Sequence, residues 1–240
     1  MLRGQVRSSG IVPRAHRDGA PLSFAQERLW FIDRLEPGSA VYNVHVARRL
    51  RGALDEAALE RALGEIVRRH EALRTTFQEV DGSPVQVIAP FGGFTLPVED
   101  LSGLGEADRG VEARRRATEE AMRPFDLAAG PLFRAVLLRL EEESHVLLLS
   151  MHHIVSDGWS TGVFFRELSA LYAAYREGRE SPLPELGVQY ADYAAWQREH
   201  LRGELLERQL SYWRERLAGA PELVELPTDH PRPAVQTFRG

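Results

Sequence analysis

The chain has 240 residues, 43% of them hydrophobic and 27% charged, and a formal net charge of −5. This is the balance of an ordinary globular protein, and an acidic chain without clustered Lys and Arg is not expected to bind nucleic acid. The absence of cysteine excludes disulfides, thiolate nucleophiles and thiolate metal ligands. No apolar run approaches the roughly 20 residues that span a bilayer, and residues 1–20 lack a secretory apolar stretch. We therefore expect a cytoplasmic protein without membrane contact.

The first elements are predicted from composition and capping signals. Residues 1–20 are rich in Arg, Gly, Ser and Pro, which is typical of a linker or flexible tail. Ser23 and Gln26 have the spacing of a capping box and open a helix that should end by Pro37. Residues 43–50 alternate enough to predict a strand.

The next segment predicts a helix followed by a hairpin. Asp55 precedes a run of apolar residues at helical spacing. Residues 73–78 are β-like, and the Asp81-Gly82 turn joins them to a second strand at 85–88.

The middle of the chain predicts a Gly-rich loop over 91–105 and a charged helix from about 106 to 122. Two apolar strands, 132–140 and 145–151, form a hairpin, and the second should be buried on both faces. A helix is expected from about 160 to 177.

The last part predicts more helix. Gly178 is placed just after the preceding helix, and residues 181–184 form a rigid connector. Two further helices are expected at about 188–201 and 204–218. Mixed helices and strands with antiparallel hairpins predict an α/β (α+β) class.

The pattern His152-His153-x-x-x-Asp157-Gly158 could carry chemistry, because it lies where a buried strand becomes a loop. Neighbours in a strand point to opposite faces, so one histidine can enter a given site. An imidazole there could take or guide a proton near neutral pH. The spacing alone leaves a structural histidine equally open. A metal site is disfavoured because no further ligands complete it, and Ser156 lacks the nucleophile-elbow pattern.

Four segments in order resemble the motifs of condensation domains in nonribosomal peptide synthetases. The segment 151–160, MHHIVSDGWS, looks like their HHxxxDG signature, and 22–30, LSFAQERLW, resembles the first core motif. The segments 69–77, RHEALRTTF, and 190–196, YADYAAW, resemble the second and fourth.

This resemblance implies a fold like chloramphenicol acetyltransferase, in which two α/β lobes form a V around a tunnel. This chain would supply one such lobe, a mixed sheet flanked by helices. Such domains join the acyl group on an upstream peptidyl carrier protein to the amine on a downstream one. Both substrates are thioesters on phosphopantetheine arms, and the domain itself needs no metal or bound cofactor. An adjacent adenylation domain is a further expected partner.

The resemblance also assigns roles to residues. His153 is the catalytic candidate, and the N–H of Gly158 is a candidate oxyanion donor. His152 is expected to be structural. Tyr190 and Trp196 belong to the fourth motif and are expected to lie beside the site or to serve packing.

A second group is expected to support the site. Asp157 is expected to pair with Arg74 and hold the loop, as in the family, with Arg69 as a weaker partner. Trp159 and Ser160 complete the third motif. This motif and the first look most like the subtype that joins an L-configured donor to an L-configured acceptor. A cyclisation domain is disfavoured, and an epimerisation domain is a weaker alternative.

The resemblance implies that a complete domain is about twice as long as this chain. We expect residues 21–180 to form the N-terminal lobe and 181–240 the crossover and the start of a truncated C-terminal lobe. The chain alone is then expected to form no peptide bond and to expose an apolar face toward the missing lobe. Two alternatives stay open: a stand-alone acyltransferase of the same superfamily, and a non-catalytic module that docks carrier proteins.

Overall fold

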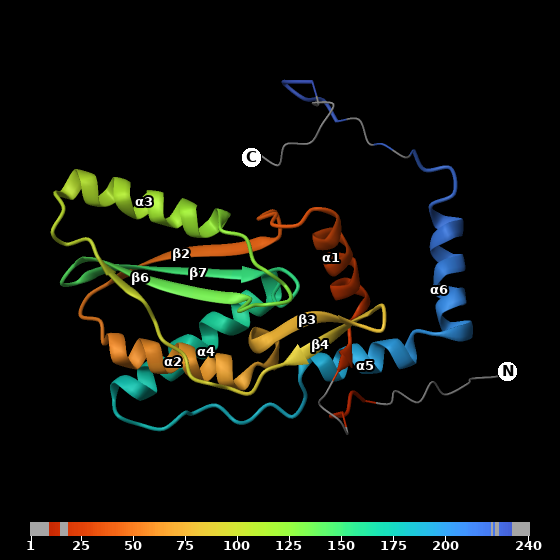
Figure 1. Cartoon of the computed structure of the whole chain (residues 1–240), viewed down its shortest axis with the longest axis horizontal. Helices are drawn as coiled ribbons and strands as arrows, with labels where there is room; N and C mark the ends of the chain where they lie inside the picture. Colours follow the sequence, from red (N-terminus) through yellow and green to blue (C-terminus); the bar gives the residue numbers. More distant parts are fainter. Residues whose placement is uncertain (1–9, 15–18, 222, 224–225, 232–240) are drawn as a thin grey trace. The chain divides into compact units, whose positions relative to one another are not determined.

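A computed structural model describes residues 10–14, 19–221, 223 and 226–231. The chain divides into two compact units, residues 1–197 and 198–240. The first unit holds both β-sheets and the helices that pack against them (Figure 1).

The elements of the chain follow in order. They are β1 (Ala20–Pro21), α1 (Phe24–Leu35), β2 (Asn43–Arg51), α2 (Glu56–Arg69), the 3₁₀ helix η1 (Glu71–Arg74), β3 (Thr75–Val80), β4 (Ser83–Ile88), β5 (Val98–Asp100), α3 (Glu106–Met122), β6 (Phe133–Glu141), β7 (Ser144–His152), α4 (Gly158–Arg176), α5 (Tyr190–His200) and α6 (Gly203–Arg216).

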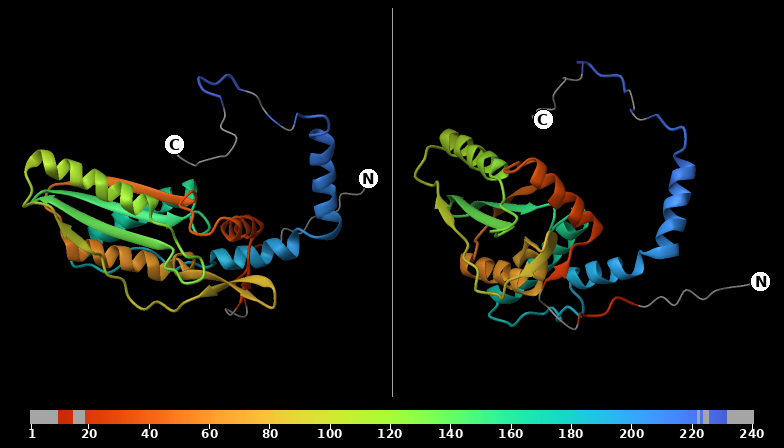
Figure 2. Two further views of the ribbon diagram at one scale, coloured as in Figure 1. Left: turned by 45° about the horizontal axis from the view of Figure 1, so that its top comes forward. Right: turned by 45° about the vertical axis from the view of Figure 1, so that its right-hand side comes forward.

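The larger sheet has the strand order β2-β7-β6-β5. β7 pairs antiparallel with β2 and with β6, whereas β5 runs parallel to β6 over three residues. Helices α2 and α4 cover one face of this sheet and α3 the other (Figures 1 and 2). The main core lies on the α2–α4 face, where fully buried residues such as Leu63, Leu147 and Leu171 meet. This arrangement confirms the predicted mixed sheet flanked by helices.

The smaller sheet has the order β1-β4-β3. A second apolar cluster joins it to α1 and to the segment after β7, with Leu22, Phe77, Leu132 and Ile154 among its buried members. This cluster fixes α1 and the residues after His152 relative to one another, because buried side chains in a close-packed interior have little freedom to move.

Most predicted elements are confirmed within two residues, and the exceptions have identifiable causes. The loop predicted over 91–105 contains β5, which has three residues and only one apolar member. The helix predicted from about 160 starts at Gly158, because Asp157 caps it. Gly178 has φ +69°, the left-handed conformation expected of the residue after a helix end.

One long-range contact ties the segment 10–14 to α5. The main-chain N–H and the Nε of Arg14 both donate to Asp192 Oδ1, at 3.1 and 2.9 Å, and Arg14 Nη2 lies 3.6 Å from Glu71. The side chains of Arg14, Asp192 and Glu71 are at most 10% exposed. The predicted linker region 1–20 therefore includes a residue that is buried against the domain.

The second unit begins at Arg198, in the last turn of α5, and its main element is α6. α6 buries no residue among those described, and Tyr212, Trp213 and Leu217 are each more than half exposed. In the part of the chain that the structure describes, no helix combines the length and apolar character that crossing a membrane requires.

Candidate active site

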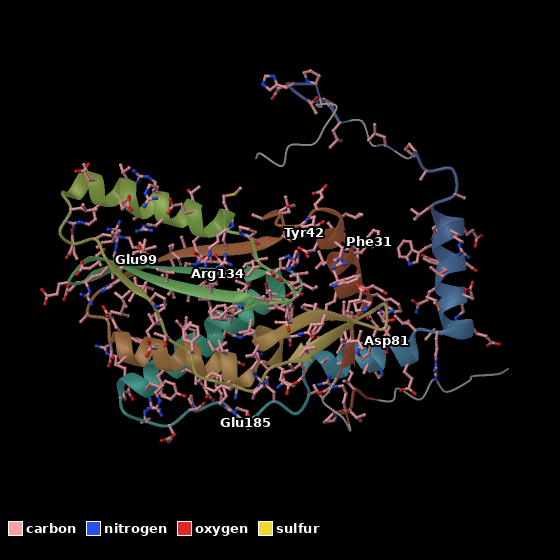
Figure 3. The ribbon with its side chains drawn as sticks, in the orientation of Figure 1. Phe31, Tyr42, Asp81, Glu99, Arg134 and Glu185 are labelled. Carbon is pink, nitrogen blue, oxygen red and sulfur yellow. The ribbon has the colours of Figure 1, made fainter. Side chains whose placement is uncertain are left out.

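Strand β7 carries the histidine pair to the site. Nearly all of its residues are buried, with the core under α2 and α4 on one face of the sheet and α3 on the other, which confirms the expected burial on both faces. His152, the last residue of β7, pairs with Asn43 of β2. The N–H of His153 donates to the carbonyl oxygen of Tyr42 at 2.8 Å. Tyr42, which is labelled in Figure 3, lies just before β2 begins. The main chain on both sides of the pair is therefore held by the sheet.

His152 is enclosed by protein. It is 3% exposed, and the rings of Tyr42 and Phe125 lie 6.4 and 6.2 Å from its own between centroids. The N–H of Ile154 donates to its Nδ1 at 3.1 Å. Burial, and to a smaller extent the neighbouring His153, lowers the pKa of His152 to about 4. The ring is therefore neutral at neutral pH, in the surroundings of a structural side chain.

His153 faces the other way and is exposed. Its Nδ1 lies 2.7 Å from the carbonyl oxygen of Ser156. Because a carbonyl oxygen only accepts hydrogen bonds, Nδ1 must carry the proton in this contact. The neutral imidazole then keeps its lone pair on Nε2, the atom through which a histidine accepts a proton.

A cavity of about 210 Å³ adjoins this ring. We call it the histidine cavity, and its polar lining includes Gln26 and Arg28 of α1, Tyr42, His153, Asp157 and Tyr190. These residues come from α1, the turn before β2, the segment after β7, and α5. The fold thus brings the first, third and fourth sequence motifs to one place.

Asp157 caps helix α4. Its Oδ1 accepts from the N–H of Ser160 at 2.7 Å and from the Ser160 hydroxyl, while that hydroxyl accepts from the Asp157 N–H at 3.2 Å. These bonds lower the pKa of Asp157, and the nearby His153 contributes in the same direction. The carboxylate therefore orders the loop through the helix end rather than through an arginine.

The structure gives Asp157 and Arg74 other contacts, and no ion pair joins the two among the described residues. Arg74 lies 3.7 Å from Glu71 and donates to the carbonyl oxygen of Ala89. Arg69, the weaker candidate, donates to Glu167 at 3.3 Å and to the carbonyl oxygen of Pro184 at 2.8 Å. The reason is local, because a side chain that caps its own helix meets its partners within three residues.

Gly158 is the first residue of α4, where the N–H has no acceptor within the helix. Among the described residues no hydrogen bond to this N–H is found. Gly158 does not line the histidine cavity, and its φ is not positive, so neither a left-handed turn nor a close approach explains the glycine. Trp159 is 84% exposed, and Ser160 lines the cavity as well as capping the helix.

The fourth motif divides into two roles. Tyr190 lines the histidine cavity, and its hydroxyl lies 3.1 Å from Ser23 Oγ. Burial raises the pKa of Tyr190, so the phenol remains protonated. Trp196 does not line the cavity and instead packs beside Tyr193, with 6.0 Å between ring centroids. The structure therefore brings Tyr190 to the site and leaves Trp196 in packing.

Four polar lining residues were not predicted as site residues: Gln26, Arg28, Tyr42 and Ser156. Gln26 was recognised as a capping residue, and its Nε2 also donates to the carbonyl oxygen of Ile154 at 3.4 Å. Its position inside the first motif was the available signal. Nothing in the local sequence marks Tyr42, which is brought in by the pairing of β2 with β7.

A larger cavity, of about 520 Å³, lies elsewhere in the first unit. It borders the part of β6 that β5 leaves uncovered, near Phe91, Arg123 and Phe133, and includes no residue of the segment 152–160. Size alone therefore does not locate the site. Across residues 10–14, 19–221, 223 and 226–231, no cluster of three His, Asp or Glu side chains could hold a metal ion.

Comparison with known proteins agrees with the four motifs. The Condensation domain family matches residues 16–240. One linear gramicidin synthase of Brevibacillus parabrevis is 53% identical over 238 residues, which cover 99% of this chain and 3% of that protein.

Two solved structures share the fold. The X-domain from teicoplanin biosynthesis, solved in complex with OxyB, has a TM-score of 0.81 and 36% identity over 94% of this chain and 49% of that one. The first condensation domain of the CDA synthetase has a TM-score of 0.77 and 28% identity over 89% of this chain and 53% of that one. This chain thus spans about half the length of both structures. The predicted chloramphenicol-acetyltransferase-like fold is confirmed, and the chain belongs to the condensation domain family of nonribosomal peptide synthetases.

Proposed function

We propose that this chain supplies the histidine-bearing part of a condensation domain that forms a peptide bond. It would transfer an aminoacyl or peptidyl group from an upstream carrier-bound thioester to the α-amine of a downstream carrier-bound aminoacyl thioester. The observation that carries this proposal is the orientation of His153. Its Nδ1 is engaged by Ser156, which leaves the Nε2 lone pair for a substrate in the histidine cavity.

The chemistry requires little activation. An α-amine has a pKa near 8 and is partly neutral at physiological pH. It attacks the thioester carbonyl, the C–N bond forms, and the resulting tetrahedral adduct must lose an N–H proton before the C–S bond breaks and thiolate leaves. His153 takes that proton on Nε2 or positions the amine for attack. The N–H of Gly158 is our candidate donor to the oxyanion, and Asp157 and Ser160 hold the loop through the helix cap.

The partners follow from the same proposal. The domain works between upstream and downstream peptidyl carrier proteins, whose phosphopantetheine arms bring the thioesters, beside an adenylation domain and with no cofactor of its own. The third motif favours an L-configured donor and acceptor. Solved relatives are about twice as long as this chain. We therefore expect its site to need the remainder of the domain, and residues 1–240 alone to give no product.

The test uses the full synthetase module with both carriers loaded. His153→Ala should lower dipeptide formation in a single turnover by about 100-fold or more, the usual effect of losing a proton-transfer residue. His45→Ala is the matched control, because His45 is an exposed histidine on β2 that lines neither the histidine cavity nor the pocket beside it. Equal rates for His153→Ala and the wild type would refute a role for this imidazole.

A second candidate is a protein-docking module without catalysis. It is favoured by the similarity to the X-domain, which was solved as a complex with OxyB. In that case, a partner protein would bind the wild type and His153→Ala with the same affinity, and loaded carriers would yield no peptide with either.

A further inference from the structure

A second cavity, of about 220 Å³, lies beside the histidine cavity. We call it the side pocket. Its walls come from the end of α2 and η1, the end of β7, the first two turns of α4, and the start of α5. Ile66, Ala72, Met151, Val163 and Phe164 are representative of these walls.

The two cavities adjoin. Both are lined by Val155, Ser156, Ser160 and Tyr190. The side pocket is therefore separated from the histidine cavity only by these shared residues. A substituent of a molecule whose reacting atoms lie near His153 would reach the side pocket past Ser160 and Tyr190.

The lining of the side pocket is mostly apolar. The imidazole in its wall is that of His70, whose Nε2 lies 2.8 Å from Glu167. Glu167 also accepts from Nε of Arg69 at 3.3 Å. His70 and Arg69 lower the pKa of Glu167 against the opposing effect of burial, so this carboxylate is ionised. These charges are paired with one another, and a charged substituent in the side pocket would find no partner among them. Burying an unpaired charge is costly.

We infer that the side pocket receives the apolar side chain of an aminoacyl thioester whose reacting centre lies at His153. This inference rests on the proposed function and adds the class of substrate. At about 30 Å³ for each water-sized group, the pocket holds about seven non-hydrogen atoms, the size of a phenylalanine side chain. Leucyl, methionyl and phenylalanyl groups fit this description, whereas an aspartyl group does not.

The experiment fills the pocket from two walls in the full synthetase module. Val163→Phe acts from α4 and Ala72→Leu from η1, and each residue lines the side pocket but not the histidine cavity. Val111→Phe is the matched control, because it places the same bulk on the exposed side of α3. The carriers are loaded with alanyl, leucyl, phenylalanyl or aspartyl groups, varied first on the donor carrier and then on the acceptor carrier.

The wild type should form product faster with phenylalanyl than with aspartyl in one of the two arms. In that arm, each filling variant should lower the rate of product formation at least about ten-fold with the phenylalanyl group and less than about two-fold with the alanyl group. The reason is that the loss of a few methylene-sized contacts changes a rate by about this much. The arm that responds identifies the donor or the acceptor. Val111→Phe should match the wild type throughout.

The variants must first show the wild-type unfolding midpoint. The inference is overturned if such variants lower the rates of product formation with alanyl and phenylalanyl groups equally, or lower neither rate. Two variants from different walls guard against one that fails to fold. The proposed function fails separately: it requires His153→Ala to lose activity with every aminoacyl group, whatever the filling variants do.

Discussion

Helices α4 and α3 are of similar length but are built differently. α4 opens with a reciprocal capping box between Asp157 and Ser160 and buries a face that includes Leu171. α3 opens at Gly105 without a side-chain cap, and none of its residues is buried. The helix that carries the motif loop is thus fixed by both its end and its face, whereas α3 lies on the sheet as a surface layer. Of these two helices, the one next to the proposed catalytic histidine is therefore the more firmly anchored.

The largest effect on stability is expected from the buried face of α4, which has no counterpart in α3. Leu171→Ala should lower the free energy of unfolding of the chain by about 2–5 kcal/mol, because it leaves a cavity in the core under α4. Val111→Ala on α3 should change it by less than about 0.5 kcal/mol, since this side chain is 58% exposed. Chemical denaturation measures both. Similar losses would show that α3 is as integral to the fold as α4.

The strand that leads into α4 should make stability depend on pH through His152. Its folded-state pKa of about 4 lies below the ordinary 6.5. The unfolded chain therefore binds a proton as pH falls below about 6.5, while the folded chain resists until about pH 4. The contribution of His152 to the free energy of unfolding is therefore fully present above about pH 6.5. It should fall by about 3 kcal/mol as the pH is lowered from about 6.5 to about 4.

His152→Asn provides the control, because an amide oxygen can accept from the Ile154 N–H without titrating. The variant should lack this part of the pH dependence in unfolding experiments between pH 4 and 7. An identical slope in both proteins would mean that the pKa of His152 is the same in the folded and the unfolded chain.

A smaller effect on stability than those of Leu171→Ala and His152 is expected at the cap of α4. Asp157→Ala should cost about 1 kcal/mol, and Asp157→Asn much less, because asparagine caps a helix as well as aspartate. In the full module, Asp157→Ala should also lower condensation, since the loop from Ser156 to Asp157 carries the acceptor for His153 Nδ1. Retained activity for Asp157→Asn would distinguish a capping role from a role for the charge. Equal activity for Asp157→Ala and the wild type would contradict both.

Much of the fold could be predicted because its signals are local. The capping box at Ser23 and Gln26, the Asp81-Gly82 turn and the apolar β7 each determine structure within a few residues. The cap at Asp157 was missed because serine, rather than Glu or Gln, stands at its third helical position. That omission placed the start of α4 two residues late, and the pairing of Asp157 with Arg74 was expected from the family resemblance alone.

The long-range parts of the site could not be obtained this way. Tyr42 reaches His153 only because β2 pairs with β7 in one register. The side pocket needs η1, β7, α4 and α5 together, and no periodicity in any one of them predicts a cavity. Motif membership located Tyr190 correctly but did not separate it from Trp196, whose aromatic ring serves packing.

The contact of Arg14 with Asp192 joins residues that lie 178 positions apart in the sequence. It fastens the segment before β1 to the first turn of α5. Tyr190, on the same turn, lines both the histidine cavity and the side pocket. A displacement of Arg14 would therefore bear on the wall that the two cavities share.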